Sequence, residues 1–187
     1  MPRDIKSKDL RIRRTYKLLL NSMITMLNRK NFNHITVNDL CEEALISRAT
    51  FYVHFNDKYD LLKYCLSDLN TDFIEVAQEY KKIETRINQF IIKNKKMIAN
   101  VITDANMETL GLIHSFIFSD VAFFIKKNGC HIKEANYAVL ANFCAGGIVN
   151  LIILLVKEEF PSDYKVMNSF TYNMIKYIIT CEDNRNI

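Results

Sequence analysis

Residues that build turns are scarce in this chain, and their scarcity limits the folds open to it. The 187 residues include only four glycines and two prolines. Sheet folds need frequent turn residues, whereas long helices with short connections do not. Apolar residues make up 49% of the chain, which is enough for a packed core and argues against general disorder. We therefore predict an all-α protein.

Apolar residues recur at three- and four-residue spacing along most of the chain, which is the helical pattern. The pattern predicts a helix-turn-helix domain over residues 1–60 and a helical domain over 61–187. Thr36 and Ser47 are good caps for the second and third helices. The predicted helices run over residues 8–29, from 36, 48–54, from 58, 83–98, 105–127, 133–159 and 162–181.

The positive charge of the chain is concentrated near its start. Residues 1–30 carry nine Lys or Arg against two Asp or Glu, while residues 61–187 carry fourteen of each kind. A local basic field suits a phosphate backbone, because each neutralised phosphate releases counterions. On charge alone, a solvated basic tail explains the same surplus equally well.

Three short helices, a tight break between the second and third, and a long helix after them form a helix-turn-helix unit. The third helix of such a unit enters the major groove, so its outer face must be small or polar. Phe51 and Phe55 are placed to anchor this helix from behind. The residues that we expect outward or at the rim are Arg48, Ala49, Thr50, Tyr52 and His54.

The chemistry of these side chains suggests a role for each. Arg48 can bond a guanine bidentately, and Thr50 can reach a base or its methyl group. Contacts to phosphates are expected from four further side chains, at the rim and at the starts of two helices: Tyr52, His54, Thr36 and Lys58. The alternative is that Tyr52, His54 and Lys58 are ordinary surface groups.

The runs 35–44 and 46–58 resemble the signature of the TetR family of transcriptional regulators. The portion from Ser47 to Lys58 reads Ser-Arg-x-Thr-Phe-Tyr-x-His-Phe-x-x-Lys and matches at nearly every defining place. The resemblance covers about residues 8–65 and is generic beyond them. It implies a homodimer with N-terminal DNA-binding domains, a larger C-terminal domain for ligand and dimer contacts, and repression as the commoner mode of action.

Two residues depart from the family's pattern. Leu45 stands where the turn usually has a glycine, and a bulky residue in a left-handed turn costs roughly 1–2 kcal/mol. Cys41 replaces a usual alanine, which is a small change in volume. Neither departure removes a side chain that faces DNA. With Leu45 in the turn, however, the exact orientation of the third helix stays open.

The helix predicted over residues 133–159 has features of a packing surface. Ala138, Ala141 and Ala145 form a stripe of small residues beside the paired glycines 146 and 147, which let another backbone come close. The resemblance implies that this helix and the last one pair with their copies in a four-helix bundle. The expected dimer interface contains Ala145, Gly146, Leu151, Leu155, Phe170, Met174 and Ile178. A wholly intramolecular core is the alternative.

A small-molecule effector is a further implication of the resemblance, since family members commonly sense one between the helices after the first three. The side chains that could line such a cavity are Met97, Met107, His114, Phe116 and Phe123. Aromatic and methionine side chains at helical spacing are also the ordinary content of a core, so that alternative stays open.

Other classes of protein find little support. The four histidines lack metal-ligand spacing and no phosphate loop is present, so we expect no enzyme, no metal and no cofactor. Five widely spaced cysteines and no signal peptide suit the cytoplasm. Residues 137–156 are uncharged and near the length of a membrane span, but we expect a helix buried on most sides in a soluble protein.

Two alternative functions therefore stay open. One is a TetR-fold protein that no longer uses DNA and binds a protein or a ligand, for which Leu45 is the only encouragement. The other is a membrane-associated helical protein based on residues 137–156, which solubility without detergent would rule out.

If Arg48 reads a base, we expect Arg48→Ala to weaken operator binding by about 1–3 kcal/mol and to relax specificity at one base pair. On sequence alone, replacing Lys58 should weaken binding to all DNA alike and flatten its dependence on salt. Titration of operator and unrelated duplexes checks both expectations. An equal loss on every DNA after Arg48→Ala would contradict the base-reading role.

Overall fold

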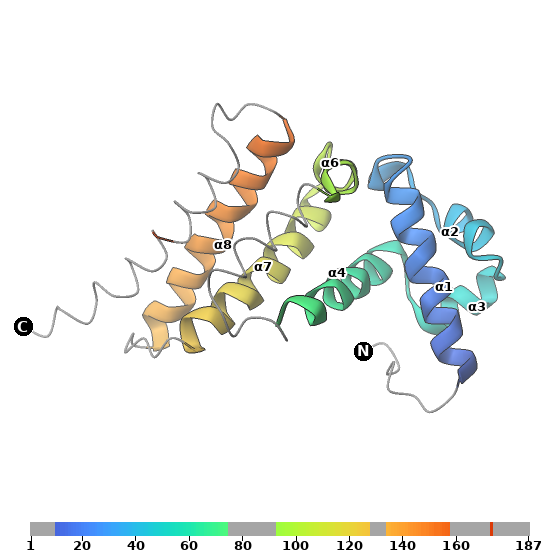
Figure 1. Ribbon diagram of the computed structural model, residues 1–187, viewed down its shortest axis with the longest axis horizontal. Coiled ribbons are helices and arrows are strands. Elements are labelled where there is room, and N and C mark those ends of the chain that lie inside the picture. Colours follow the sequence, from blue (N-terminus) through green and yellow to red (C-terminus); the bar gives the residue numbers. More distant parts are fainter. Residues whose placement is uncertain (1–9, 75–92, 128–133, 158–172, 174–187) are drawn as a thin grey trace, which may run out of the picture. The chain divides into compact units, whose positions relative to one another are not determined.

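The computed structural model describes residues 10–74, 93–127, 134–157 and 173, and every regular element in these ranges is a helix (Figure 1). The prediction of an all-α fold is confirmed. The helix predicted over residues 162–181 lies, apart from residue 173, outside the described ranges. The elements are α1 (Leu10–Leu27), η1 (Phe32–His34), α2 (Val37–Ala44), α3 (Arg48–His54), α4 (Lys58–Ile74), α6 (Lys95–Ile102), α7 (Met107–Lys127) and α8 (Glu134–Val156).

The chain folds into two compact units. The first comprises residues 1–75 and 94–109, and the second comprises residues 76–93 and 110–187. The first unit therefore contains the predicted helix-turn-helix together with α4 and α6. The domain boundary at residue 60 stays a prediction, and the place of α6 beside the N-terminal helices was not apparent from the sequence.

The core of the first unit is built on one face of α1, which contacts α2, α4 and α6. Tyr16 lies at its centre and is almost fully buried. Its ring meets the rings of His54, Phe55 and Tyr64 edge-on, at centroid distances of 5.1–5.2 Å. Edge-to-face packing of this kind adds about 0.5–1.5 kcal/mol per pair to the burial itself. These rings join α1, the end of α3 and α4.

The two helices of the helix-turn-helix begin on the caps that the sequence predicts. The Thr36 hydroxyl accepts from the Asp39 backbone N–H at 3.2 Å, and the Asp39 carboxylate accepts from the Thr36 backbone N–H at 2.7 Å, which completes a capping box. The Ser47 hydroxyl accepts from the Thr50 N–H at 3.0 Å. The donation of Lys30 to Asp39 and these cap bonds lower the pKa of the Asp39 carboxyl to about 2.

Leu45 ends α2 in the left-handed conformation, with φ 54° and ψ 42°. Its N–H donates to the carbonyls of Cys41 and Glu42, so the turn has the bonds of a helix C-terminus. The strain expected from the sequence is therefore present. The side chain is 92% exposed and gains no burial in return.

The Lys58 side chain joins the start of α4 to η1. Its ammonium donates to the carbonyls of Phe32, Asn33 and Ile35 at 3.0, 3.0 and 2.9 Å, and lies 4.7 Å from the centroid of the Phe32 ring. An ammonium has three N–H donors, so these three bonds use all of them. Burial lowers the pKa of Lys58, which the carboxylates of Asp39 and Glu108 partly oppose.

Three asparagine side chains attach α6 and the turn after it to the N-terminal helices. Asn100 donates to the Leu27 carbonyl at 2.7 Å, Asn106 donates to the Tyr59 hydroxyl at 2.9 Å, and Asn33 donates to the carbonyl of Asp104. The sequence predicted one helix over residues 83–98, but the structure has a turn at residue 94 and begins α6 at residue 95. Packing of residues 95–102 on α1 explains the difference.

The described part of the second unit contains most of α7 and all of α8. α7 buries Ile113, Ile117, Val121 and Ile125, which are spaced four residues apart on one face. The Tyr137 hydroxyl of α8 donates to the carbonyl of Ala122 on α7.

The expectation that α8 would be buried on most sides is wrong for the single chain. Only 17% of its most apolar window is buried, and Val139 and Phe143 are each 70% exposed. The stretch 137–156 is long and apolar enough to cross a membrane by length and composition alone, the one such helix among the described residues. The sequence pattern could not show this because an apolar face buried within the chain and one left open have the same composition.

We expect Leu45→Gly to stabilise the protein by about 1 kcal/mol, because glycine adopts the left-handed conformation without strain but loses more entropy on folding. Leu45→Ala is the matched control, since it removes the exposed side chain and keeps the Cβ that causes the strain. Urea unfolding of the three proteins measures the difference. Equal stabilisation by alanine and glycine would show that the leucine side chain, not the backbone, is unfavourable.

We expect Lys58→Met to lower the free energy of unfolding by roughly 1–3 kcal/mol, because three carbonyls lose their common donor while the apolar stem is kept. Lys63→Met is the control, an exposed lysine on the same helix whose loss should change stability by less than about 0.5 kcal/mol. Thermal or urea unfolding makes the comparison. A fully stable Lys58→Met protein with a flatter salt dependence of DNA binding would place the ammonium on a phosphate instead.

Candidate nucleic-acid interface

The exposed residues of α3 are Arg48, Ala49, Tyr52 and the apolar Val53, and the inner face of the helix is apolar. Arg48 and Ala49 are exposed, and Tyr52 is 49% exposed. Behind them Phe51 is fully buried, and Phe55 caps the helix in a buried position. The division of the helix into these two faces is the one that a helix needs to enter the major groove of DNA.

Arg48 and Tyr52 form a pair on this outer face. The guanidinium carbon of Arg48 lies 5.9 Å from the centroid of the Tyr52 ring, and Nη2 donates a long hydrogen bond of 3.5 Å to the Tyr52 hydroxyl. Residues four apart on a helix are neighbours, so the pair follows from the spacing. A guanidinium resting on a ring keeps its forked donors partly ordered, which favours bidentate bonding to a guanine.

Two of the predicted contacts already have partners within the protein. The Thr50 hydroxyl lies 2.9 Å from the Ser47 hydroxyl, and Thr50 is half-buried. His54 is half-buried as well, with its ring 5.1 Å from that of Tyr16. A contact of either side chain with DNA stays a prediction, and the structure adds a packing role that the sequence did not indicate for His54.

Thr36 and Lys58 lie at the starts of α2 and α4, as the sequence predicts, and both are engaged. The exposed Thr36 hydroxyl donates to the Asp39 carboxylate at 2.8 Å as part of its capping box. Lys58 is half-buried, and its ammonium donates to the carbonyls of η1 and of Ile35 just after it. A phosphate bound by Lys58 would have to replace one of these carbonyls.

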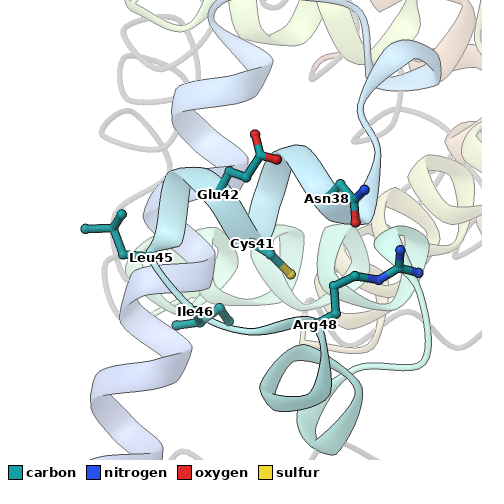
Figure 2. Close-up of a pocket in the computed structure, with 6 residues that line it drawn as sticks. All are labelled: Asn38, Cys41, Glu42, Leu45, Ile46 and Arg48. Atoms are coloured by element: carbon teal, nitrogen blue, oxygen red, sulfur yellow. The ribbon is translucent and has the colours of Figure 1, made fainter.

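A shallow groove borders the outer face of α3 where the chain turns from α2 (Figure 2). Its lining residues are Asn38, Cys41, Glu42, Leu45, Ile46 and Arg48. Figure 2 shows the Cys41 thiol pointing between α2 and Arg48, while Leu45 points away from the other side chains. Burial raises the pKa of the Cys41 thiol, so this group is a neutral packing element. Sequence reasoning missed Asn38, an exposed residue that shares the groove with Arg48.

The residues predicted to line an effector cavity are divided between the two units. Met97 is buried in the first unit, and Met107 in the same unit is 83% exposed. In the second unit His114 and Phe116 are half-buried and Phe123 is exposed. Their common role in ligand binding stays a prediction.

The predicted dimer residues are described only in α8. Ala145 is buried, Gly146 is exposed, and Leu151 and Leu155 are half-buried. The other three, Phe170, Met174 and Ile178, lie outside the described residues. A Cβ built on Gly146 would meet nothing within 4 Å, so no close packing within the described chain explains this glycine.

The titratable residues of the described ranges do not assemble a metal site, since no group of three His, Cys, Asp or Glu side chains is placed to hold an ion. Three cysteines there, Cys41, Cys65 and Cys144, are free and buried. These three cysteines therefore pack as small core residues.

Comparisons with known proteins bear on this arrangement of helices. Residues 19–65 match the profile described as bacterial regulatory proteins of the tetR family. No curated protein matches the chain closely enough to count as a relative. Several solved structures share the fold at low sequence identity.

One similar structure is a TetR transcriptional regulator from Streptococcus agalactiae 2603V, with a TM-score of 0.64 and 21% identity over 92% of this chain and 99% of that one. Another is the fatty acid degradation regulator FadR from Bacillus halodurans, with a TM-score of 0.58 and 14% identity over 91% and 96%. The dihydroxyacetone kinase operon activator DhaS has a TM-score of 0.56 and 18% identity over 89% and 97%.

The match spans the segment that contains α2, α3 and the start of α4, and the similar structures extend the likeness of fold over most of the chain. The resemblance on residues 47–58 is confirmed: residues 19–65 match the tetR family of bacterial regulatory proteins, and the similar structures show that the chain shares their fold.

Proposed function

We propose that the protein is a sequence-specific transcriptional regulator, a repressor that binds a palindromic operator as a homodimer and is released by a small-molecule effector. The observation that carries this proposal is the outer face of α3, with Arg48 and Tyr52 exposed above the buried Phe51. Arg48 would read a guanine, and Tyr52 would meet a phosphate beside it.

The exposed apolar face of α8 supports the homodimer. Val139 and Phe143 are largely exposed in the single chain, and exposed apolar surface of this kind marks an interface when it forms a patch. Gly146 and Gly147 are exposed as well and offer close approach to a second backbone. Two copies joined along α8 would present two α3 helices, one for each half of an inverted repeat.

The anchoring of α6 supports effector control. α7 begins in the first unit at Met107 and continues into the second unit from Leu110. A ligand that moves α7 would act on Asn100, Asn106 and the turn held by Asn33, which attach α6 and its turn to the N-terminal helices. Two-state coupling of this type needs only a difference in affinity between the two arrangements.

The proposed direction of regulation is repression. We choose repression because it is the family's commoner habit, while one structural neighbour is described as an operon activator. A reporter gene placed behind the operator determines the sign directly.

The test of the proposal is a selection of bound duplexes from a random pool by the purified full chain, at two salt concentrations. We expect one inverted repeat to be enriched at both, because a dimer reads two half-sites a helical turn apart. Weak, salt-sensitive binding with no enriched sequence would overturn the proposal and favour a partner-binding protein, with the exposed Leu45 as a first place to look.

Two variants sharpen this selection. Arg48→Lys keeps the charge but loses the fork, so it should lose preference for one base pair while binding phosphates as before. Tyr52→Phe keeps the ring beneath Arg48 and removes only the hydroxyl.

We expect Gly146→Leu to fold as a subunit and to weaken the dimer. Among the described residues a side chain at this position meets nothing, so the chain itself has room for it, whereas a second copy packed on α8 would not. Sedimentation measures the oligomeric state, and Lys157→Leu, at the exposed end of the same helix, is the control. An unchanged dimer would move the interface elsewhere.

A further inference from the structure

The first turns of α1 hold a group of cations that the helix-turn-helix signature does not include. Arg13, Arg14 and Lys17 are all exposed, and none forms an ion pair within the described part of the chain. Just after the C-terminal end of α1, by contrast, the cations form ion pairs: Arg29 pairs with Glu43, and Lys30 pairs with Asp39. We call Arg13, Arg14 and Lys17 the α1 basic face.

This grouping does not help the helix to form. Arg13 and Lys17 are four residues apart and Arg14 and Lys17 three apart, and like charges at these spacings are destabilising by a few tenths of a kcal/mol. The helix as described, residues 10–27, has no acidic residue to compensate them. A bound anion would therefore relieve the repulsion between these three cations.

The turns of α1 that carry the α1 basic face pack beside the end of α3. Tyr16 falls between its members in sequence, and the Tyr16 ring packs 5.1 Å from the ring of His54, the last residue of α3. In Figure 1 the N-terminal end of α1 runs past α3. Tyr16 faces the core, whereas the three cations are exposed. The cations therefore project from the sides of these turns that do not face the core.

A major groove about 12 Å wide is nearly filled by a helix of 10–12 Å diameter, so elements beside the helix meet the sugar-phosphate strands at the groove walls. We propose that the α1 basic face binds phosphates of the DNA that flanks each half-site read by α3. This inference rests on the proposed function, and it adds to it a second, sequence-independent contact surface that lengthens the footprint.

The test compares the full chain with the variant Arg13→Gln, Arg14→Gln, Lys17→Gln, in which glutamine keeps helix propensity and removes the charge. Binding to the selected operator is measured over a salt series. We expect the slope of log affinity against log salt to fall by about 0.9 for each phosphate that the variant no longer neutralises, with the preference for the operator over random DNA unchanged.

The control removes three exposed lysines elsewhere, Lys93→Gln, Lys96→Gln and Lys126→Gln, and so matches the loss of charge. It should leave the slope nearly as in the wild type, because none of these lysines belongs to the α1 basic face. Thermal unfolding of both variants confirms that they are folded before binding is compared.

A second measurement uses operator duplexes with progressively shorter flanks. The wild type should lose affinity as the flanking base pairs are removed, whereas the α1 variant should be insensitive to the same trimming. If the wild type binds the operator specifically but the α1 variant keeps the full slope and the full sensitivity to trimming, the inference is wrong and the proposed function stands. If the wild type selects no sequence, the proposed function itself fails.

Discussion

The helix that we propose to read DNA has seven residues, which is too short to persist on its own in water. Its existence therefore depends on what lies behind it. Phe51 and Phe55 bury their rings in the core, and Tyr16 of α1 packs against Phe55 and His54. The Ser47 cap fixes the first turn at the other end. The exposed side chains of α3 are positioned by these buried contacts and by the Ser47 cap.

The same dependence separates two kinds of polar residue around α3. Lys58 and the Thr36 hydroxyl hold the frame together through bonds inside the protein, and His54 packs against the core. Arg48, Tyr52 and the α1 basic face point outward and form no ion pair among the described residues. A sequence signature joins residues of both kinds, so matching it does not by itself identify the groups that touch DNA.

Features set by neighbours in the chain could be predicted from the sequence. The caps at Thr36 and Ser47 and the bounds of α3 follow from local side-chain chemistry, and the structure confirms each of them. The left-handed conformation of Leu45 does not follow from its side chain, and only the family's usual glycine at this place suggested it. Tyr16 and Phe51 as core residues follow from helical periodicity.

Contacts between distant parts of the chain could not be predicted in this way. The three carbonyls that accept from Lys58 belong to a short 3-10 helix and to Ile35 just after it, and no periodic pattern in the sequence predicts this helix. The hydrogen bond from Asn100 that docks α6 joins residues more than seventy positions apart. The turn at residue 94 accompanies this docking, so local sequence does not predict it. The openness of α8 is also a property of the fold, since composition does not tell which apolar face lacks a neighbour.

The central claim is that Arg48 on α3 reads a base in the major groove. Methylation interference on the selected operator tests it most directly, because methylation at guanine N7 blocks the acceptor that a forked guanidinium needs. We expect methylation of one guanine in each half-site to interfere with binding by the wild type and to have no such effect on Arg48→Ala. Interference that is the same for both proteins, or none at any guanine, would contradict it.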